Sequence, residues 1–387
     1  MRIYKPAFFW FVVALAVRAA AALALHLYSI SAGFEGFYPL ASGHDDRQYW
    51  KLAASLADGM KPVDLPHAYP LVLAFLFRCF GPSLVLGKAL NILAGSVTVA
   101  LGVLITRDLS RHVTTSWRKT LHPVNVAGLL LTFYPSAVFY STQLVKDPIL
   151  VLLGMWSVYI VVRIVHERRF SLWALWVGSL AALYLFRPYA ACVMGLSVLV
   201  FLTSFWRARL RTRVTVLLIA VLTSASVPNL LGWGWFGSSY LAPLLDPEFV
   251  IQFRERAYSS GGSAVGIELN YLEPLSFVSS YSYGLLTVLF GPFPWQIRSA
   301  VMYIALPESL VMLSLGIVAL SKKSKPDVYQ REQLLLLILA VLMSAAIALF
   351  SDNIGANTRL RLLPWSALLI YGAAKWDSRR RTSVYST

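Results

Sequence analysis

Apolar segments long enough to cross a lipid bilayer follow one another along almost the whole of this 387-residue chain. A transmembrane helix needs about 20 mostly apolar residues to cross the hydrocarbon core, which is ~30 Å thick. Apolar residues make up 58% of the sequence and charged residues 13%, and the mean hydropathy is +0.64. These values exceed those of a soluble domain. We therefore predict an all-α, polytopic membrane protein in contact with membrane lipids.

Lysine and arginine gather in short clusters at every second connection between the apolar segments. The clusters are Arg2 and Lys5; Arg107, Arg111, Arg118 and Lys119; Arg163, Arg168 and Arg169; Arg207, Arg209, Arg211 and Arg213; Lys322, Lys323, Lys325 and Arg331; and Lys375, Arg379, Arg380 and Arg381. Because basic loops remain in the cytoplasm, both termini are predicted to be cytoplasmic, in a plasma (inner) membrane protein. The net charge of +16 is split among separate loops, which argues against nucleic acid as a partner.

The alternation of these clusters with acidic or neutral connections predicts about ten transmembrane helices. The predicted spans are 7–30, 83–106, 122–142, 147–166, 172–187, 188–205, 213–231, 301–321, 332–351 and 362–376. Two shorter apolar stretches remain, 69–80 and 283–297. If either stretch alone crossed the membrane, the basic clusters that follow it would be placed on the outer side. We interpret them as juxtamembrane helices on the outer leaflet, the second interrupted at Gly291-Pro292. The chain is then a single transmembrane domain, 1–387, with two outer loops, 31–82 and 232–300.

The first outer loop carries two adjacent carboxylates, Asp45 and Asp46. An apolar stripe from Asp46 to Asp58, followed by Gly59, predicts an amphipathic helix that lies on the membrane. A carboxylate at the start of a helix is stabilised by free backbone N–H groups and by the dipole, so capping explains one of these acids. A catalytic acid pair is the alternative, and the pair alone does not decide between the two.

Four cations fall on the predicted outer face, against the charge bias of the rest of the chain. They are Lys146, Arg187, Arg359 and Arg361. Long basic side chains at helix ends commonly reach toward lipid headgroups, which is the simpler interpretation. Arginine and lysine beside a membrane groove also suit a lipid phosphate, because guanidinium groups match phosphate oxygens. Arg18, in the middle of the first span, must face protein or a polar cavity.

Three pieces of the sequence carry a resemblance to a known superfamily. The first reads Asp45-Asp46-Arg47-Gln48-Tyr49, then Leu52-Ala53, Leu56 and Gly59, then Ala68-Tyr69-Pro70-Leu71, Leu73-Ala74, Phe77-Arg78 and Phe80-Gly81. The others read Phe133-Tyr134-Pro135-Ser136 through Lys146-Asp147, and Arg359-Leu360-Arg361-Leu362-Leu363-Pro364-Trp365. Together they resemble membrane-embedded glycosyltransferases with the GT-C fold, the relatives of protein O-mannosyltransferases and aminoarabinose transferases.

The resemblance implies a cell-envelope enzyme of polysaccharide biosynthesis that acts on the outer face. Such an enzyme moves a sugar from a polyprenyl-phosphate donor to a hydroxyl of a glycan, lipid or protein acceptor, with inversion. The first acid of the family's pair is the general base, which corresponds to Asp45, with Asp46 as its support or a metal ligand. Tyr49 matches the family's tyrosine after the pair, and with Lys146, Arg187, Arg359 and Arg361 it is a candidate for substrate binding.

The sequence departs from the family pattern in the second half of the first loop. Leu65 stands where many relatives have a basic residue, and His67 follows two positions later, so His67 is either a phosphate contact or an interfacial histidine. No metal ligand set is predicted, although His44 beside the acid pair leaves a divalent cation open. The loop 232–300 is interpreted as a lid or as an unstructured loop. A polysaccharide polymerase, suggested by Arg254 and Arg256, and a lipid or sugar transporter or flippase remain as alternatives.

Overall fold

A computed structural model describes most of the chain. It covers residues 4–37, 45–60, 65–110, 122–204, 247–258, 263–297, 303, 305–320 and 330–384. Within these ranges the chain is all-helical, and its one β-type pairing is the isolated bridge between Ala264 and Asn353. The predicted span 213–231 lies outside the described residues. The helices divide into two compact units, residues 1–186 with 369–387 and residues 187–368, which we call the first and second units.

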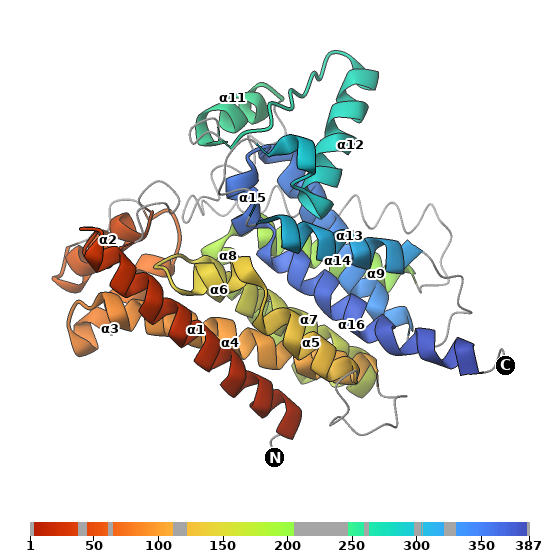
Figure 1. Cartoon of the computed structure of the whole chain (residues 1–387), viewed down its shortest axis with the longest axis horizontal. Helices are drawn as coiled ribbons and strands as arrows, with labels where there is room; N and C mark the ends of the chain where they lie inside the picture. The colour runs from red at the N-terminus through yellow and green to blue at the C-terminus, as the bar shows by residue number, and fades with distance from the viewer. Residues whose placement is uncertain are drawn as a thin grey trace. The chain divides into compact units, whose positions relative to one another are not determined.

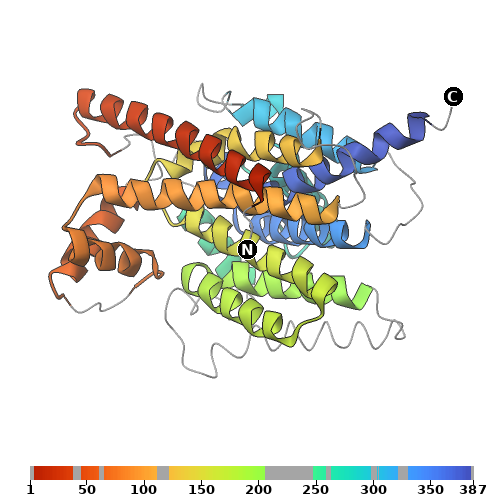
Figure 2. The same cartoon turned by 90° about the horizontal axis from the view of Figure 1, so that it is seen from below.

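The first unit is organised around α4. Its helices are α1 (Lys5–Ser31), α2 (Asp45–Ala57), α3 (Tyr69–Phe80), α4 (Leu84–Leu109), α5 (Pro123–Thr132), α6 (Pro135–Ser141), α7 (Asp147–Glu167), α8 (Phe170–Phe186) and the later part of α16 (Leu362–Val384). Helix α4 packs against α1, α5 and α7, as Figures 1 and 2 show. Gly102 allows close approach, because a Cβ there would lie 2.2 Å from Leu131 Cδ1. Small residues of this kind are typical of packed transmembrane helices.

The predicted span 122–142 is broken in the structure. Helix α5 ends at Thr132, α6 begins at Pro135, and the two axes differ by 53°. Proline has no N–H to continue the α5 hydrogen bonds, so the last carbonyls of α5 need other partners. Arg18 of α1 supplies them: Nη2 donates to Leu131 O at 3.2 Å and Nη1 to Thr132 O at 3.5 Å. The expectation that Arg18 faces protein is confirmed, since its side chain is 2% exposed.

Gly95 of α4 leaves room for the side chains of Arg18 and Ser141. We therefore expect Gly95→Ala to destabilise the first unit. The added Cβ would lie 2.6 Å from Ser141 Oγ and 2.8 Å from Arg18 Nε. Overpacking of this kind costs about 1–3 kcal/mol. Gly178→Ala in α8 is the matched control, because a Cβ there meets nothing within 4 Å and the change favours helix by about 1 kcal/mol. Thermal unfolding in detergent, followed by circular dichroism, measures both. Equal melting temperatures for the two variants would contradict the packing described here.

The second unit contains the remaining described helices. They are α9 (Pro188–Ser204), α11 (Pro247–Tyr258), α12 (Pro274–Phe290), α13 (Leu306–Leu320), α14 (Gln330–Phe350), α15 (Ile354–Leu360) and the first residues of α16. Helix α14 packs against α9 and α12. The expected helix at 283–297 was placed wrongly, because α12 begins at Pro274 and ends at Phe290. Proline in the first turn is a start signal, and the serines of this helix weaken the apolar pattern that we relied on.

Four described helices are long and apolar enough to cross a membrane: α1, α4, α7 and residues 332–350 of α14. The bent pair α5–α6 makes a fifth if it forms one span. Shorter apolar helices occupy other predicted spans, at α8, α9 and α13. The structure therefore has the helices of a membrane protein, whereas ten crossings and the orientation of the termini remain predictions.

Candidate functional site

The acid pair begins helix α2. Asp45 is its first residue, both acids lie in the first turn, and the helix ends at Ala57, before Gly59 with φ +94°. The predicted helix from 46 to 58 is thereby confirmed to within one residue at each end. The two acids differ in environment, since Asp45 is half-buried while Asp46 is 4% exposed. Asp46 Oδ1 accepts the Arg47 N–H at 2.8 Å.

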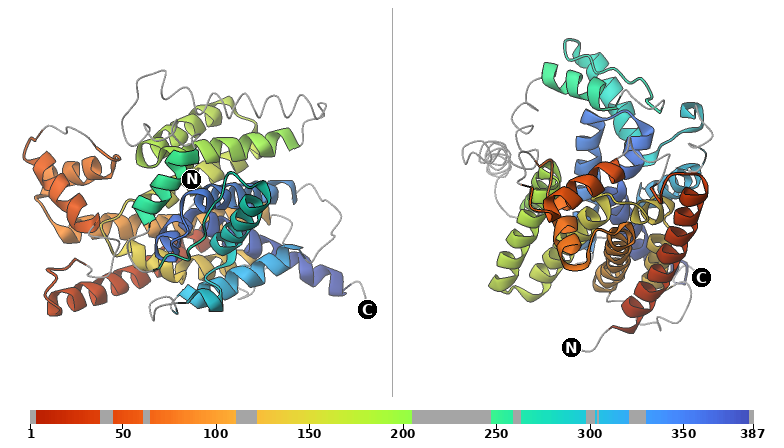
Figure 3. Two further views of the ribbon diagram at one scale, coloured as in Figure 1. Left: turned by 90° about the horizontal axis from the view of Figure 1, so that it is seen from above. Right: turned by 90° about the vertical axis from the view of Figure 1, so that its left-hand side faces the viewer.

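A buried lysine of α4 contacts the turn that follows α1. Lys88 is 8% exposed, and its Nζ donates to Gly36 O at 2.7 Å and lies 3.3 Å from His26 Nδ1. The first turn of α2 therefore carries one buried acid and one that is more accessible. Figure 3 shows α2 and α3 as a pair at one end of α4.

An aromatic cluster continues from α2 into α3. The Tyr49 ring lies 4.8 Å from the His67 ring and 5.8 Å from the Tyr69 ring, centroid to centroid. His67 is 1% exposed, and the neighbouring Ala68 N–H donates to Leu185 O of α8 at 2.9 Å. His67 is thus enclosed by aromatic side chains, and the structure does not place it on an exposed surface as an interfacial histidine would be.

Asn91 of α4 connects this cluster to the start of α7. Its Nδ2 donates to Tyr69 Oη at 3.0 Å and to Val145 O at 2.9 Å. Lys146 follows Val145 as the N-cap of α7, half-buried, and Asp147 of the first turn is buried. One run of contacts in the first unit therefore extends from α2 through the aromatic cluster to the loop before α7. The structure brings Asp45, Asp46, Tyr49, His67 and Lys146 into this region.

The other three predicted phosphate contacts belong to the second unit. Arg187 precedes α9 and lies over the Tyr189 ring, 5.6 Å from its centroid, and Arg359 is half-exposed in the last turn of α15. Arg361 is 1% exposed; it donates to Gly291 O, lies 3.7 Å from Glu308 and stacks on Trp365. Arg361 therefore contacts protein groups in the interior of this unit, and its role toward a lipid phosphate remains a prediction.

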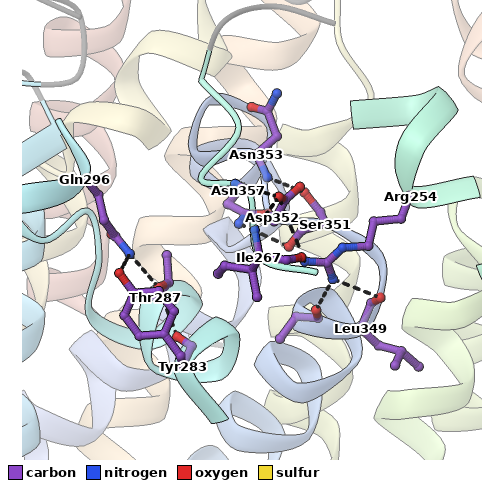
Figure 4. Close-up of polar contacts among 12 residues, drawn as sticks. Arg254, Ile267, Tyr283, Thr287, Gln296, Leu349, Ser351, Asp352, Asn353 and Asn357 are labelled. Carbon is purple, nitrogen blue, oxygen red and sulfur yellow. Dashed lines mark hydrogen bonds and ion pairs between the residues drawn. The ribbon is translucent and has the colours of Figure 1, made fainter. Parts of the chain in front are cut away.

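The second unit also contains a polar network that the sequence did not reveal, drawn in Figure 4. Arg254 of α11 donates to Ala348 O at 2.9 Å and to Ile267 O at 2.7 Å, and lies 4.0 Å from Asp352. Asp352 Oδ2 in turn accepts the N–H groups of Gly266 and Ile267, each at 3.1 Å. Burial lowers the pKa of the Arg254 guanidinium, and the Asp352 charge opposes this shift. The network holds residues 263–267 against residues 351–353, which connect α14 to α15.

This network bears on two earlier interpretations. Arg254 was a reason to consider a polymerase, yet its guanidinium is bound by protein groups here; the side chain of Arg256 is outside the described residues. Within the predicted lid, 232–246 also falls outside them, whereas 263–267 is held in place. A role as a lid stays a prediction.

No group of three or more metal-ligating side chains occurs among the residues that the structure describes. His44, the residue that left a divalent cation open, lies outside that part of the chain.

No protein-family model, no curated protein and no solved structure matches this chain.

Proposed function

We propose that this chain is a membrane glycosyltransferase with a GT-C-like arrangement of about ten spans. It takes a sugar from a polyprenyl-phosphate donor and transfers it, with inversion, to an acceptor hydroxyl at the outer face of the plasma (inner) membrane. The resemblance of the three sequence pieces suggests this activity. The observation that carries it is the pair of adjacent acids at the start of α2 in two different environments.

Different environments favour different roles for two neighbouring carboxylates. Asp45 is the more accessible, so it suits the general base that must meet an acceptor hydroxyl. Asp46 is buried, so it suits the support of that base. Both acids lie in the first turn of α2, at the positive end of the helix dipole.

The proposed reaction is a single displacement at the anomeric carbon. The acceptor hydroxyl gives its proton to the Asp45 carboxylate while its oxygen forms a bond to that carbon. The bond from the carbon to the phosphate oxygen breaks, and polyprenyl phosphate leaves with the electron pair. This leaving group needs charge stabilisation rather than protonation, which a nearby cation supplies.

Lys146 lies in the first unit together with the two acids, and we predict that it contacts the donor phosphate. We expect Lys146→Met to lower kcat/KM for the lipid donor about 10–100-fold. A charge-assisted hydrogen bond to phosphate is worth about 1.5–3 kcal/mol. Lys146→Arg keeps the charge and is expected to keep most of the activity. Arg169→Met, at the other end of α7, is the control, because that side chain is largely exposed. If Lys146→Met matches the wild type across donor concentrations, Lys146 is not a donor contact.

The function itself is tested by incubating the purified wild-type protein with a panel of polyprenyl-phosphate sugars and with glycan, lipid and peptide acceptors. We expect a product of one added sugar whose anomeric configuration, measured by NMR, is opposite to that of the donor. Retained configuration, or a ladder of long chains as a polymerase makes, would contradict the proposal. Movement of the intact lipid-linked sugar across vesicles, without cleavage of its anomeric bond, would identify a flippase instead.

A further inference from the structure

Asn91 of α4 uses only the nitrogen of its side-chain amide. Its Nδ2 donates to Tyr69 Oη at 3.0 Å, to Val145 O at 2.9 Å and to Gln143 O. An NH₂ group has two N–H donors, so these three acceptors already share them. The Oδ1 of the same amide is buried and accepts no hydrogen bond from the described residues. Asn91 therefore holds the connection before α7 through its nitrogen and keeps an unused acceptor.

Gln143 has a buried amide of which neither end is used. The residue is 2% exposed, and neither its Oε1 nor its Nε2 has a hydrogen-bond partner in the described part of the chain. Gln143 lies in the connection between α6 and α7, and its backbone carbonyl is one of the acceptors of Asn91. Two neighbouring residues thus contain three buried polar atoms without partners.

The unused atoms are two acceptors and one donor nitrogen, and this combination selects a class of ligand. Buried polar atoms without partners are costly, and each one in a native protein needs an explanation. An ionised phosphate only accepts, so it would leave Asn91 Oδ1 unpaired. A cation attracts only the oxygens, so it would leave Gln143 Nε2 unpaired. A hydroxyl group both donates and accepts, so hydroxyl groups satisfy both amides.

We propose that Asn91 and Gln143 recognise ring hydroxyls on the sugar of the lipid-linked donor, and that Gln143 determines the specificity for that sugar. The identity of the ligand rests on the proposed function. Lys146, the expected phosphate contact, follows Gln143 by three residues in the same connection. The donor phosphate is bonded to the anomeric carbon, so the ring hydroxyls lie close to it. Gln143 belongs to no helix, so its side chain can turn toward a sugar without breaking helical hydrogen bonds.

Thermal unfolding without any ligand tests whether the protein itself uses the Gln143 amide. Methionine has a similar shape and no amide, so we expect Gln143→Met to keep or raise the melting temperature. Gln296→Met is the matched control. Gln296 is 4% exposed, and its Nε2, drawn in Figure 4, donates to Tyr283 Oη and Thr287 Oγ1 at 2.8 Å each. That variant is expected to melt about 2–4 °C lower.

A Gln143→Met protein that melts at a lower temperature than the wild type, or that fails to fold, would overturn the proposal. Its amide would then be bonded within the protein or to an ordered water.

Lipid binding tests what the Gln143 amide recognises. The probes are polyprenyl-phosphate glucose, galactose and mannose, with polyprenyl phosphate alone, added to the purified full chain in nanodiscs. We expect the wild type to bind at least one glycosylated lipid about 10-fold more tightly than polyprenyl phosphate. Gln143→Met is expected to lose most of this preference and to keep its affinity for polyprenyl phosphate. An equal loss for both kinds of lipid, or a wild type without any preference, would contradict sugar recognition.

Deoxy derivatives of the preferred sugar identify the hydroxyl group. We expect the wild type to bind one derivative as weakly as Gln143→Met binds the parent sugar, and we expect the variant not to distinguish these two lipids. If each missing hydroxyl weakened binding equally in the wild type and in the variant, Gln143 would not contact the sugar.

Transfer assays separate the sugar site from the proposed function. A wild type that prefers a glycosylated lipid but transfers no sugar would sink the proposed enzyme and leave the sugar site standing. Normal transfer by Gln143→Met, with the same preference among donor sugars as the wild type, would refute the role of Gln143 and leave the enzyme standing.

Discussion

Asp45→Asn is expected to lower the rate of sugar transfer by about 10²–10⁴-fold, because a positioned general base typically contributes that much. Asparagine keeps the shape of the side chain and an oxygen that can still cap α2, but it cannot accept the proton of the acceptor hydroxyl. Binding of the lipid donor is expected to persist. Single-turnover transfer assays with the purified variant, at saturating donor, measure the loss.

Two further substitutions on α2 and at its end make this result interpretable. Asp58→Asn changes an exposed acid just after the helix and is expected to leave both transfer and melting temperature unchanged. Asp46→Asn changes the buried acid and is expected to affect stability as well as transfer, because the Arg47 N–H then has a neutral acceptor in place of a charged one. If the Asp45→Asn protein folded normally and transferred sugar at the wild-type rate, Asp45 would be a helix cap and would not be the general base.

Arg254→Met is expected to destabilise the second unit by about 3–5 kcal/mol, the usual effect of removing one partner of a buried ion pair. The substitution leaves the carbonyls of Ala348 and Ile267 without their guanidinium donor and Asp352 without its cation. A lower melting temperature in detergent and faster proteolysis within residues 263–267 are the measurements. The second readout reports locally on the segment that the network holds.

The neighbouring position on the same helix supplies the control for this experiment. Gln252→Met introduces the same side chain at an exposed site of α11 and is expected to change the melting temperature little. Arg254→Lys is expected to recover only part of the loss, because an ammonium group cannot reproduce the forked geometry of guanidinium. Equal stability of Arg254→Met and Gln252→Met would show that the network contributes nothing to the folded state.

Local patterns were sufficient to predict most of the described helices. Helices α2 and α3 were predicted within one residue of their observed ends, because an apolar stripe and a following glycine are signals within one segment. The break between α5 and α6 was missed, although Pro135 is a visible signal for it. A long apolar run is a stronger signal than one proline, because proline is tolerated in such a run where other groups satisfy the freed carbonyls.

The candidate site was predictable only in part. The acid pair and Lys146 could be chosen from sequence, since charge beside a membrane span is conspicuous. Lys88 was not chosen, because a single lysine near the start of an apolar span resembles many interfacial lysines. Its significance comes from His26 and Gly36, which lie 62 and 52 residues away in the chain. Their partnership with Lys88 leaves no periodic pattern in the sequence.

The sequence by itself determined that the chain is helical and apolar, where most helices begin and end, and that two acids start a surface-type helix. These properties follow from residue composition, short-range periodicity and backbone signals within a few residues. The tertiary structure decided what the buried charges do. Arg18 donates to carbonyls more than 110 residues away, Arg254 donates to a carbonyl of α14, and Lys88 donates to Gly36 in the turn after α1. A buried charge must find partners wherever the packing places them, and packing joins residues that are distant along the chain.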